Sequence, residues 1–442
     1  MSAEVSLRRR LVGGTMATTA IKAAGMGFAF AIGVVLARAL GAEGLGAYAY
    51  AMAWVNLLAL PAAAGLHTIV VRDVAAAHVR KQWGLTRGLL AWSSRAALGF
   101  SLALGAAAFG LATVLGGRTD PRVVATLWIS LPLVPLAALT RLRQAALQGL
   151  RHPSAGEFPE YVVEPTVFLV LLGIAATLAF RLTAETAMVF NVAATFAAFL
   201  VGTRILLSLI PREVKEAEAK YQPRQWIAAA LPLLAFFAMS ALNQRIDIVL
   251  LQALRGSAPV GIYSVAFAGA ELLSLVYLAA HTVVSPAISS LYAEGQLGRL
   301  QRMLTASSRW IFGLTLPAGL ALIVLAQPLL RIFGPEFVAA VSPLAILCVG
   351  RLVNVATGWN LASLMMTGYQ REAASLLAVM LALNVVVSAA LISAWGINGA
   401  AAGSAIRMIV WNLLLSWQLR ARTGLDSSIL GLPVRPSTMM RA

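Results

Sequence analysis

The 442-residue chain contains little charge and a single cysteine. Asp, Glu, Lys and Arg make up only 12% of the residues, and Cys348 on its own excludes an intramolecular disulfide and a cysteine-rich metal site. The four histidines lie far apart rather than at the spacing of metal ligands, and neither a GxxxxGK[ST] phosphate-binding loop nor an HExxH motif occurs. We therefore expect a protein that is not an enzyme and that holds no metal or other cofactor.

Hydrophobic residues dominate the rest of the chain. They form 60% of the sequence and give it a mean hydropathy of +0.82. They occur in blocks of roughly 20 to 28 residues, and a helix of about 20 residues crosses the hydrocarbon core of a bilayer. The sequence predicts an all-α polytopic membrane protein with about 12 transmembrane helices, at residues 13–37, 46–66, 86–115, 123–149, 160–180, 186–208, 226–251, 262–284, 304–326, 337–366, 373–394 and 398–419.

Basic residues outnumber acidic ones by 34 to 17, which gives a formal net charge of +17. In a soluble protein this charge would suggest binding to nucleic acid. With the N-terminus in the cytoplasm, however, about 23 of the 34 Lys and Arg residues fall on the inner side of the predicted spans, as the positive-inside rule requires. We therefore expect a multi-pass protein of the bacterial inner membrane, with both termini in the cytoplasm, membrane lipids as partners and no nucleic acid.

The longest polar interruption is the segment IPREVKEAEAKYQPRQ, residues 210–225. Its mixed charge and its two prolines are typical of a linker between domains. The sequence thus predicts an N-terminal lobe of six helices at 1–209, a cytoplasmic linker at 210–225, a C-terminal lobe of six helices at 226–420 and a cytoplasmic tail at 421–442.

The two lobes share a weak internal repeat. The segment LARALGAEGLGAYAYAMA aligns without gaps to LQALRGSAPVGIYSVAFA and pairs Gly41 with Gly256 and Tyr48 with Tyr263. Glycine permits a tight turn between two spans, and tyrosine suits the membrane interface, with its ring in lipid and its hydroxyl in water. Because six helices return the chain to its starting side, we expect the lobes to be related by a pseudo-two-fold axis along the membrane normal.

Several segments together resemble a known family. These are the basic start, LARALGAEGLGAYAYA, GLHTIVVRDVA, PAISSLYAEGQLGRL and the terminal GYQREAASLLAVMLALNVVVSAALISAWGINGAAAGSAI. In this order they are similar to the polysaccharide transporter family of the multidrug/oligosaccharidyl-lipid/polysaccharide (MOP) flippase superfamily, over nearly the whole chain.

The resemblance implies a V-shaped pair of six-helix bundles that works by alternating access. It also implies a cargo, an undecaprenyl-diphosphate-linked repeat unit of O-antigen or exopolysaccharide, which moves from the cytoplasmic to the periplasmic leaflet. A polysaccharide polymerase and chain-length machinery are the protein partners that such a role implies.

Ionisable residues inside spans are costly unless they face a cavity or a partner, so they are the best candidates for the site. A lipid diphosphate is an anion, and Arg or Lys side chains in a water-filled cavity could replace its hydration with charge-assisted hydrogen bonds. The candidates for such a cationic cavity are Lys22, Arg95, Arg245, Arg351 and Arg407.

Each of these cations has an alternative reading, in which it pairs with an acid or a helix-end carbonyl, or extends to the interface. Among the acids, Asp247 and Glu271 are candidates for binding a coupling H⁺ or Na⁺. Their alternative is a structural salt bridge, for example to Arg245 or Arg407. Arg245 and Asp247 lie two residues apart and do not face each other on a helix.

Three other functions stay open at this point. A drug or cation antiporter of the same superfamily would carry a cationic cargo, which the excess of intramembrane Arg and Lys opposes. A polysaccharide polymerase or O-antigen ligase usually carries a large periplasmic loop, whereas every outer loop predicted here is short. A scaffold in envelope assembly would tolerate loss of Lys22, Arg351 and Arg407, which a flippase would not.

Overall fold

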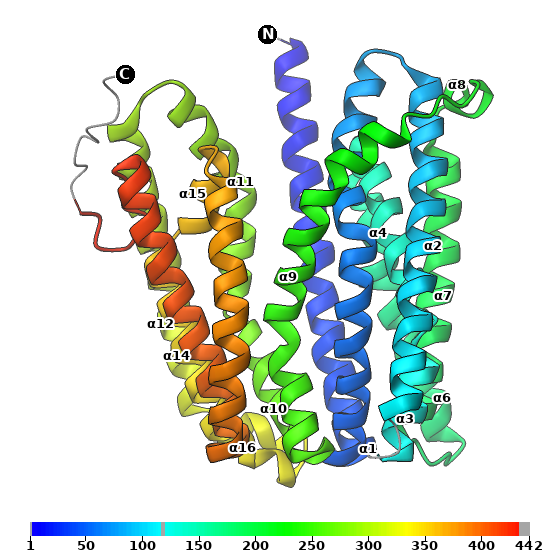
Figure 1. Ribbon diagram of the computed structural model, residues 1–442, viewed down its shortest axis with the longest axis vertical. Helices are drawn as coiled ribbons and strands as arrows, with labels where there is room; N and C mark the ends of the chain where they lie inside the picture. Colours follow the sequence, from blue (N-terminus) through cyan, green and yellow to red (C-terminus); the bar gives the residue numbers. More distant parts are fainter. Residues whose placement is uncertain (1, 116–119, 433–442) are drawn as a thin grey trace. The chain divides into compact units, whose positions relative to one another are not determined.

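The computed structural model describes residues 2–115 and 120–432, and these residues are almost entirely helical (Figure 1). Arg118 of a predicted outer loop and residues 433–442 of the predicted tail lie outside the described ranges. The chain forms two compact units, Met1–Leu242 and Asn243–Ala442, each with its own core.

Unit 1 is built on long helices that run side by side, α1 against α2 and α4, and α4 against α7 (Figure 1). Its elements are α1 (Ser2–Val79), α2 (Trp83–Leu115), α3 (Pro121–Ser130), α4 (Leu133–Gly149), α5 (Pro153–Phe158), the π-helix η2 (Pro159–Val163), α6 (Glu164–Thr177), α7 (Ala184–Leu209), α8 (Arg212–Glu216) and the first part of α9 (Pro223–Arg255).

Unit 2 is organised around α14, which packs against both α12 and α16. Its elements are the rest of α9, α10 (Ser257–Glu271), α11 (Ser274–Ala293), α12 (Leu297–Val324), α13 (Ala326–Arg331), the 3-10 helix η3 (Pro335–Ala340), α14 (Val341–Thr357), α15 (Asn360–Met366) and α16 (Gln370–Thr423).

The predicted all-α membrane fold is confirmed, and the candidate spans lie where spans were predicted, except that the predicted span 337–366 is divided into α14 and α15. In the described residues, nine helical stretches are long and apolar enough to cross a membrane, and the bent pair formed by α10 and the start of α11 makes ten. Two of the ten, α1 and α16, are each interrupted by a glycine with non-helical backbone angles, Gly41 and Gly396. Counted as two spans each, they bring the total to the twelve predicted.

The predicted glycine turns of the internal repeat are present. Gly41 has φ 66° and ψ −178°, and its counterpart Gly256 has φ 80° and ψ −171°. Both conformations lie at positive φ, which side chains with a Cβ rarely adopt, so glycine at these positions lets the first and second helix of each half meet in a sharp bend.

The expectation for the paired tyrosines was wrong. Tyr263 is completely buried, and its hydroxyl donates to Asp247 Oδ2 at 3.0 Å rather than to water. The Tyr48 hydroxyl accepts a hydrogen bond from the side chain of Asn191. A phenol hydroxyl inside a membrane protein requires a polar partner, and here a neighbouring helix provides that partner in each unit.

The polar segment after α7 packs against α2. The Lys220 backbone N–H donates to the Gly84 carbonyl at 2.9 Å, and Arg87 donates to the carbonyls of Lys215 and Ala217 at 2.7 and 2.8 Å. A Cβ at Gly88 would overlap the Lys220 backbone, so the close approach depends on glycine.

The end of unit 2 is organised by Asp426, which lies just after α16. Its carboxylate accepts from the backbone N–H groups of Ser428 and Leu432, both at 2.9 Å, and from Arg420 at 3.1 Å. Burial alone would raise the pKa of Asp426, but these hydrogen bonds and the Arg420 charge outweigh it and hold the pKa below its ordinary value of 3.8. The ionised carboxylate therefore holds residues 428–432 close to the end of α16.

Candidate functional site

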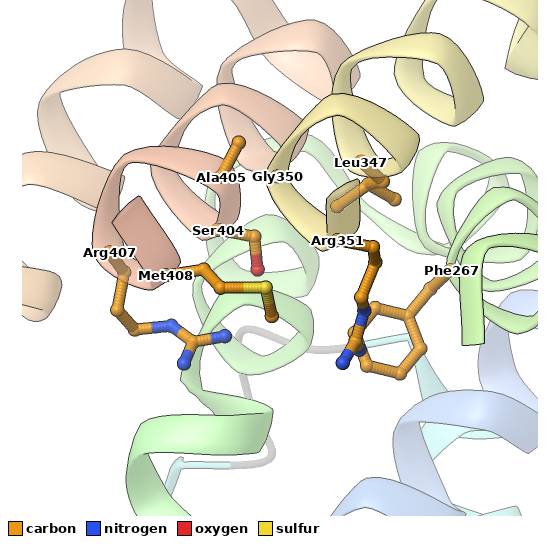
Figure 2. Close-up of a pocket in the computed structure, with 8 residues that line it drawn as sticks. All are labelled: Phe267, Leu347, Gly350, Arg351, Ser404, Ala405, Arg407 and Met408. Atoms are coloured by element: carbon orange, nitrogen blue, oxygen red, sulfur yellow. The ribbon is translucent and has the colours of Figure 1, made fainter. Parts of the chain in front are cut away.

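The candidate site in unit 2 is a small pocket where α10, α14 and α16 meet. It is lined by Phe267, Leu347, Gly350, Arg351, Ser404, Ala405, Arg407 and Met408. Figure 2 shows Arg351 and Arg407 reaching it from α14 and α16, with Met408 between them in this view. The structure thus brings two of the predicted cationic residues together.

Close packing of α14 on α16 places these two arginines at one pocket. A Cβ built on Gly350 would lie 3.0 Å from Cα and 3.1 Å from Cβ of Ala405. Small residues at such a contact let two helix backbones approach, as is common in membrane proteins. Arg351 follows Gly350 directly and Arg407 lies two residues after Ala405, so the same contact sets the position of both guanidinium groups.

Arg351 has an acid partner. Its guanidinium forms a salt bridge with Glu271 at the end of α10, and its Nη1 donates to Ser274 Oγ at 3.3 Å. The guanidinium carbon also lies 5.7 Å from the centre of the Phe267 ring, within the range of a cation–π interaction (Figure 2). The Glu271 side chain is 42% exposed, so the pair is open at its acidic end.

Arg407 has no acid partner in the described part of the chain. Its Nε is buried and has no hydrogen-bond acceptor there. A buried guanidinium nitrogen that lacks a partner costs about 1–3 kcal/mol. Among the cations predicted for the cavity, Arg407 therefore combines a place at the pocket with donor capacity that the described residues leave unused.

Arg245 and Asp247, two residues apart on α9, form no salt bridge with each other in the described residues. The Arg245 guanidinium carbon lies 5.7 Å from the centre of the Phe267 ring, so Arg245 and Arg351 share one aromatic neighbour. The Asp247 side chain is buried and forms no salt bridge with either arginine in the described residues. Its Oδ2 accepts from Tyr263 and from Ser404, a pocket residue, whereas its Oδ1 has no hydrogen-bond partner among the described residues.

The remaining two cations lie in unit 1. Lys22 Nζ is 3.1 Å from Glu157 Oε1 and 5.8 Å from the centre of the Tyr161 ring. Arg95 is exposed on α2. The structure does not bring these two residues together, and Lys22 already has an acid for its charge.

The predicted list of cavity cations missed a buried cation of unit 1, Arg143, although it lies within the predicted span 123–149. Arg143 lies inside α4 with only 4% of its surface exposed, and its Nη1 donates to the Phe199 carbonyl at 3.0 Å. Its Nε and Nη2 have no partner in the described ranges. The signal that could have found it is its place inside the predicted span, which ends six residues later at 149.

Two acids lie near this arginine, Glu160 on η2 and Glu164 on α6, and Glu157 of α5 lies near Glu160. Glu157 pairs with Lys22, Glu160 accepts from Gln144, and Glu164 accepts from Thr195 at 3.1 Å. The π-helix η2 carries Glu160, and π-helical turns inside α-helices are frequent at functional sites. No group of three His, Cys, Asp or Glu side chains in the described residues is arranged to hold a metal ion.

Comparison with known proteins shows the family of this chain. The model of a family described as "Polysaccharide biosynthesis protein" matches residues 11–292, which is more than half of the chain. No protein with a curated description matches the sequence.

Solved structures with a similar fold are transporters and flippases. A multidrug resistance MATE family transporter of the MOP superfamily, in an inward-facing conformation, matches with a TM-score of 0.72 at 16% identity, over 89% of this chain and 93% of that one. The lipid II flippase MurJ matches with a TM-score of 0.65 at 13% identity, over 92% and 87%. A MOP superfamily transporter from Pyrococcus furiosus matches with a TM-score of 0.64 at 16% identity, over 92% and 95%. At these identities the likeness shows the fold.

Proposed function

This chain belongs to the polysaccharide biosynthesis protein family, and from that membership we propose that it is a flippase for an undecaprenyl-diphosphate-linked oligosaccharide. The proposed direction is from the cytoplasmic to the periplasmic leaflet of the bacterial inner membrane, by alternating access between the two units. Both termini then lie in the cytoplasm, and a polymerase with its chain-length machinery acts on the flipped product.

The observation that carries the proposal is Arg407, an intramembrane cation without an acid partner in the described residues, at the same pocket as Arg351. The neighbourhood holds three guanidinium groups, of Arg245, Arg351 and Arg407, against two carboxylates, of Asp247 and Glu271. An excess of positive charge inside the membrane is costly unless an anion meets it. A diphosphate can accept from a guanidinium fork through two oxygens.

The sign of this charge also separates the proposal from a drug or cation antiporter. A cationic cargo would meet Arg407 without a screening acid and would be repelled. An anionic headgroup would instead satisfy the unused donors of Arg407.

The test is a flipping assay on the full chain in liposomes. A fluorescent undecaprenyl-diphosphate oligosaccharide is included, and a membrane-impermeant glycosidase is added outside. Without flipping, only the outer-leaflet pool is digested, whereas the flippase should expose the inner pool within the time of the assay. If the inner pool stays as protected as in protein-free liposomes, under every ion gradient applied, the proposal fails. Transport of an organic cation by the same liposomes would favour the antiporter instead.

We further propose that Asp247 binds the coupling H⁺ or Na⁺. The supporting facts are its burial, the hydroxyls of Tyr263 and Ser404 at its Oδ2, and the lack of a partner for Oδ1 in the described residues. Glu271, the other candidate, already pairs with Arg351. Flipping by the wild type should then respond to an imposed gradient of one of these ions, and Asp247→Asn should remove the response. An equal response in the variant would refute this role.

A further inference from the structure

A polar face on α11 continues from the Arg351 pocket. Ser274, Tyr277 and His281 are spaced three and four residues apart, so they lie on one side of the helix. Ser274 is the residue that accepts from Arg351 Nη1, at 3.3 Å. At a rise of about 1.5 Å per residue, the row extends about 10 Å from Ser274 to His281. These three residues are referred to below as the α11 row.

The middle of the row is an aromatic platform with a fixed orientation. The Tyr277 ring stacks on Trp359, with 4.5 Å between ring centres and 22° between planes. Trp359 is fully buried, and its Nε1 donates to Ser307 Oγ at 2.9 Å. Trp359 therefore holds one face of the tyrosine ring, and the Tyr277 side chain stays partly exposed beyond it.

Two residues of the row, Tyr277 and His281, carry polar groups that Arg351 does not use. The Tyr277 hydroxyl makes no hydrogen bond to any described residue. The His281 side chain is exposed and has one polar neighbour, Ser285 Oγ, at 3.3 Å from its Nε2. A phenylalanine and an apolar residue would pack against Trp359 equally well, so packing alone does not explain a tyrosine and a histidine here.

The location of the row makes these polar atoms costly without a ligand. Residues from Ser274 to His281 belong to the bent span formed with α10, and the neighbouring Leu278 exposes an apolar side chain from the same helix. If they faced only lipid, the Tyr277 hydroxyl would have no hydrogen-bond partner and the His281 imidazole would have only Ser285. A face of this composition fits a polar cargo that moves past it.

We propose that the α11 row binds the sugar next to the diphosphate, with one face of the pyranose ring against Tyr277 and its hydroxyls bonded to Tyr277 and His281. This inference rests on the proposed function, because it takes Arg351 and Arg407 as the diphosphate end of the same cargo. Sugars present C–H groups on their ring faces and hydroxyls at their edges, which matches an aromatic ring flanked by polar groups.

The experiment compares two soluble probes, farnesyl diphosphate with and without one N-acetylhexosamine, for binding to the purified full chain in detergent. The wild type should bind the glycosylated probe more tightly. Tyr277→Leu combined with His281→Ala should weaken the glycosylated probe by about 10-fold and leave the bare diphosphate unchanged. Arg407→Gln should weaken both probes. Tyr277→Phe keeps the ring, removes only the hydroxyl and guards against a variant that fails to fold. Leu278→Ala is the matched control on the same helix.

Two outcomes overturn the inference. One is a wild type that binds both probes equally, and the other is a double variant that weakens both probes alike or neither. Because binding is measured apart from transport, these results stand whether or not the chain flips lipid. Conversely, if binding depends on the sugar through the α11 row but no flipping occurs in liposomes, the proposed function is refuted. The α11 row then remains a glycan-binding site.

Discussion

Replacing Arg407 by methionine separates the role in cargo binding from a role in holding the fold. The substitution keeps an unbranched side chain of similar length and removes the charge and all donors. Arg407 has no acid partner in the described residues, and its Nε is buried without an acceptor. No buried acid is thus left without its cation when Arg407 is removed, in contrast to a broken salt bridge.

Arg407→Met should not lower stability but should slow transport. A buried donor without a partner costs about 1–3 kcal/mol, so Arg407→Met should leave the thermal midpoint unchanged or raise it. A hydrogen bond to a charged group contributes about 1.5–3 kcal/mol, and about 1.4 kcal/mol is a factor of ten. If Arg407 meets the diphosphate, flipping should therefore slow by about 10- to 150-fold.

The liposome assay and a thermal unfolding curve of the same preparation measure both quantities. Arg302→Gln is the matched control, because Arg302 is an exposed arginine of α12 in the same unit. A variant that flips lipid at the wild-type rate would refute the argument, and so would one that loses flipping only in proportion to its loss of folded protein.

Three further predictions follow from the same unit. Arg351→Met should lower the thermal midpoint because it leaves Glu271 without its cation, and adding Glu271→Gln should restore much of the loss. An outcome in which the two losses simply add would argue against the salt bridge. Gly350→Val should separate α14 from α16 at Ala405 and cost about 1–3 kcal/mol of stability, seen as a lower midpoint, whereas an unchanged midpoint would argue against the close contact. Asp426 has a pKa below 3.8, so its contribution to stability should be complete above that pH and lost as the pH falls through the lower folded pKa. The midpoint difference between wild type and Asp426→Asn should thus be constant from about pH 5 to pH 8 and should shrink below pH 3.8.

The sequence was sufficient for the spans because hydrophobic length and glycine breaks are local properties. The turns at Gly41 and Gly256 could be predicted from the repeat, because a positive φ depends on the identity of a single residue. The partner of each charge could not be predicted. Arg351 meets Glu271 from a different helix, and that contact depends on how α10 packs on α14. Periodicity carries no information about such a pairing.

Arg143 and Tyr263 are two further residues whose surroundings could not be predicted from the sequence. Arg143 falls within the predicted span 123–149 but was not among the predicted cavity cations, and the structure places it inside α4, where it donates to a carbonyl of α7. Tyr263 was assigned to the interface because tyrosine is common there. In the structure its hydroxyl bonds the buried carboxylate of Asp247. Asp247 lies on α9 and Tyr263 lies on α10, so the contact joins two helices.

The internal repeat gives a reason to place ion coupling in unit 2. Tyr48 and Tyr263 occupy equivalent positions, and each bonds a residue of the last span of its half, Asn191 on α7 and Ser404 on α16. Gly41 and Gly256 differ by 215 positions, and the same offset pairs Asp247 with Ile32. Unit 1 thus has an aliphatic side chain where unit 2 has a buried carboxylate. A tyrosine bonded to an amide cannot follow a proton or a sodium ion, whereas one bonded to a carboxylate can, because binding of the cation changes the charge that its hydroxyl donates to. The repeated tyrosine therefore supports helix contact in both units, and within the described residues its hydroxyl bonds a carboxylate only in unit 2, the carboxylate proposed above to bind the coupling ion.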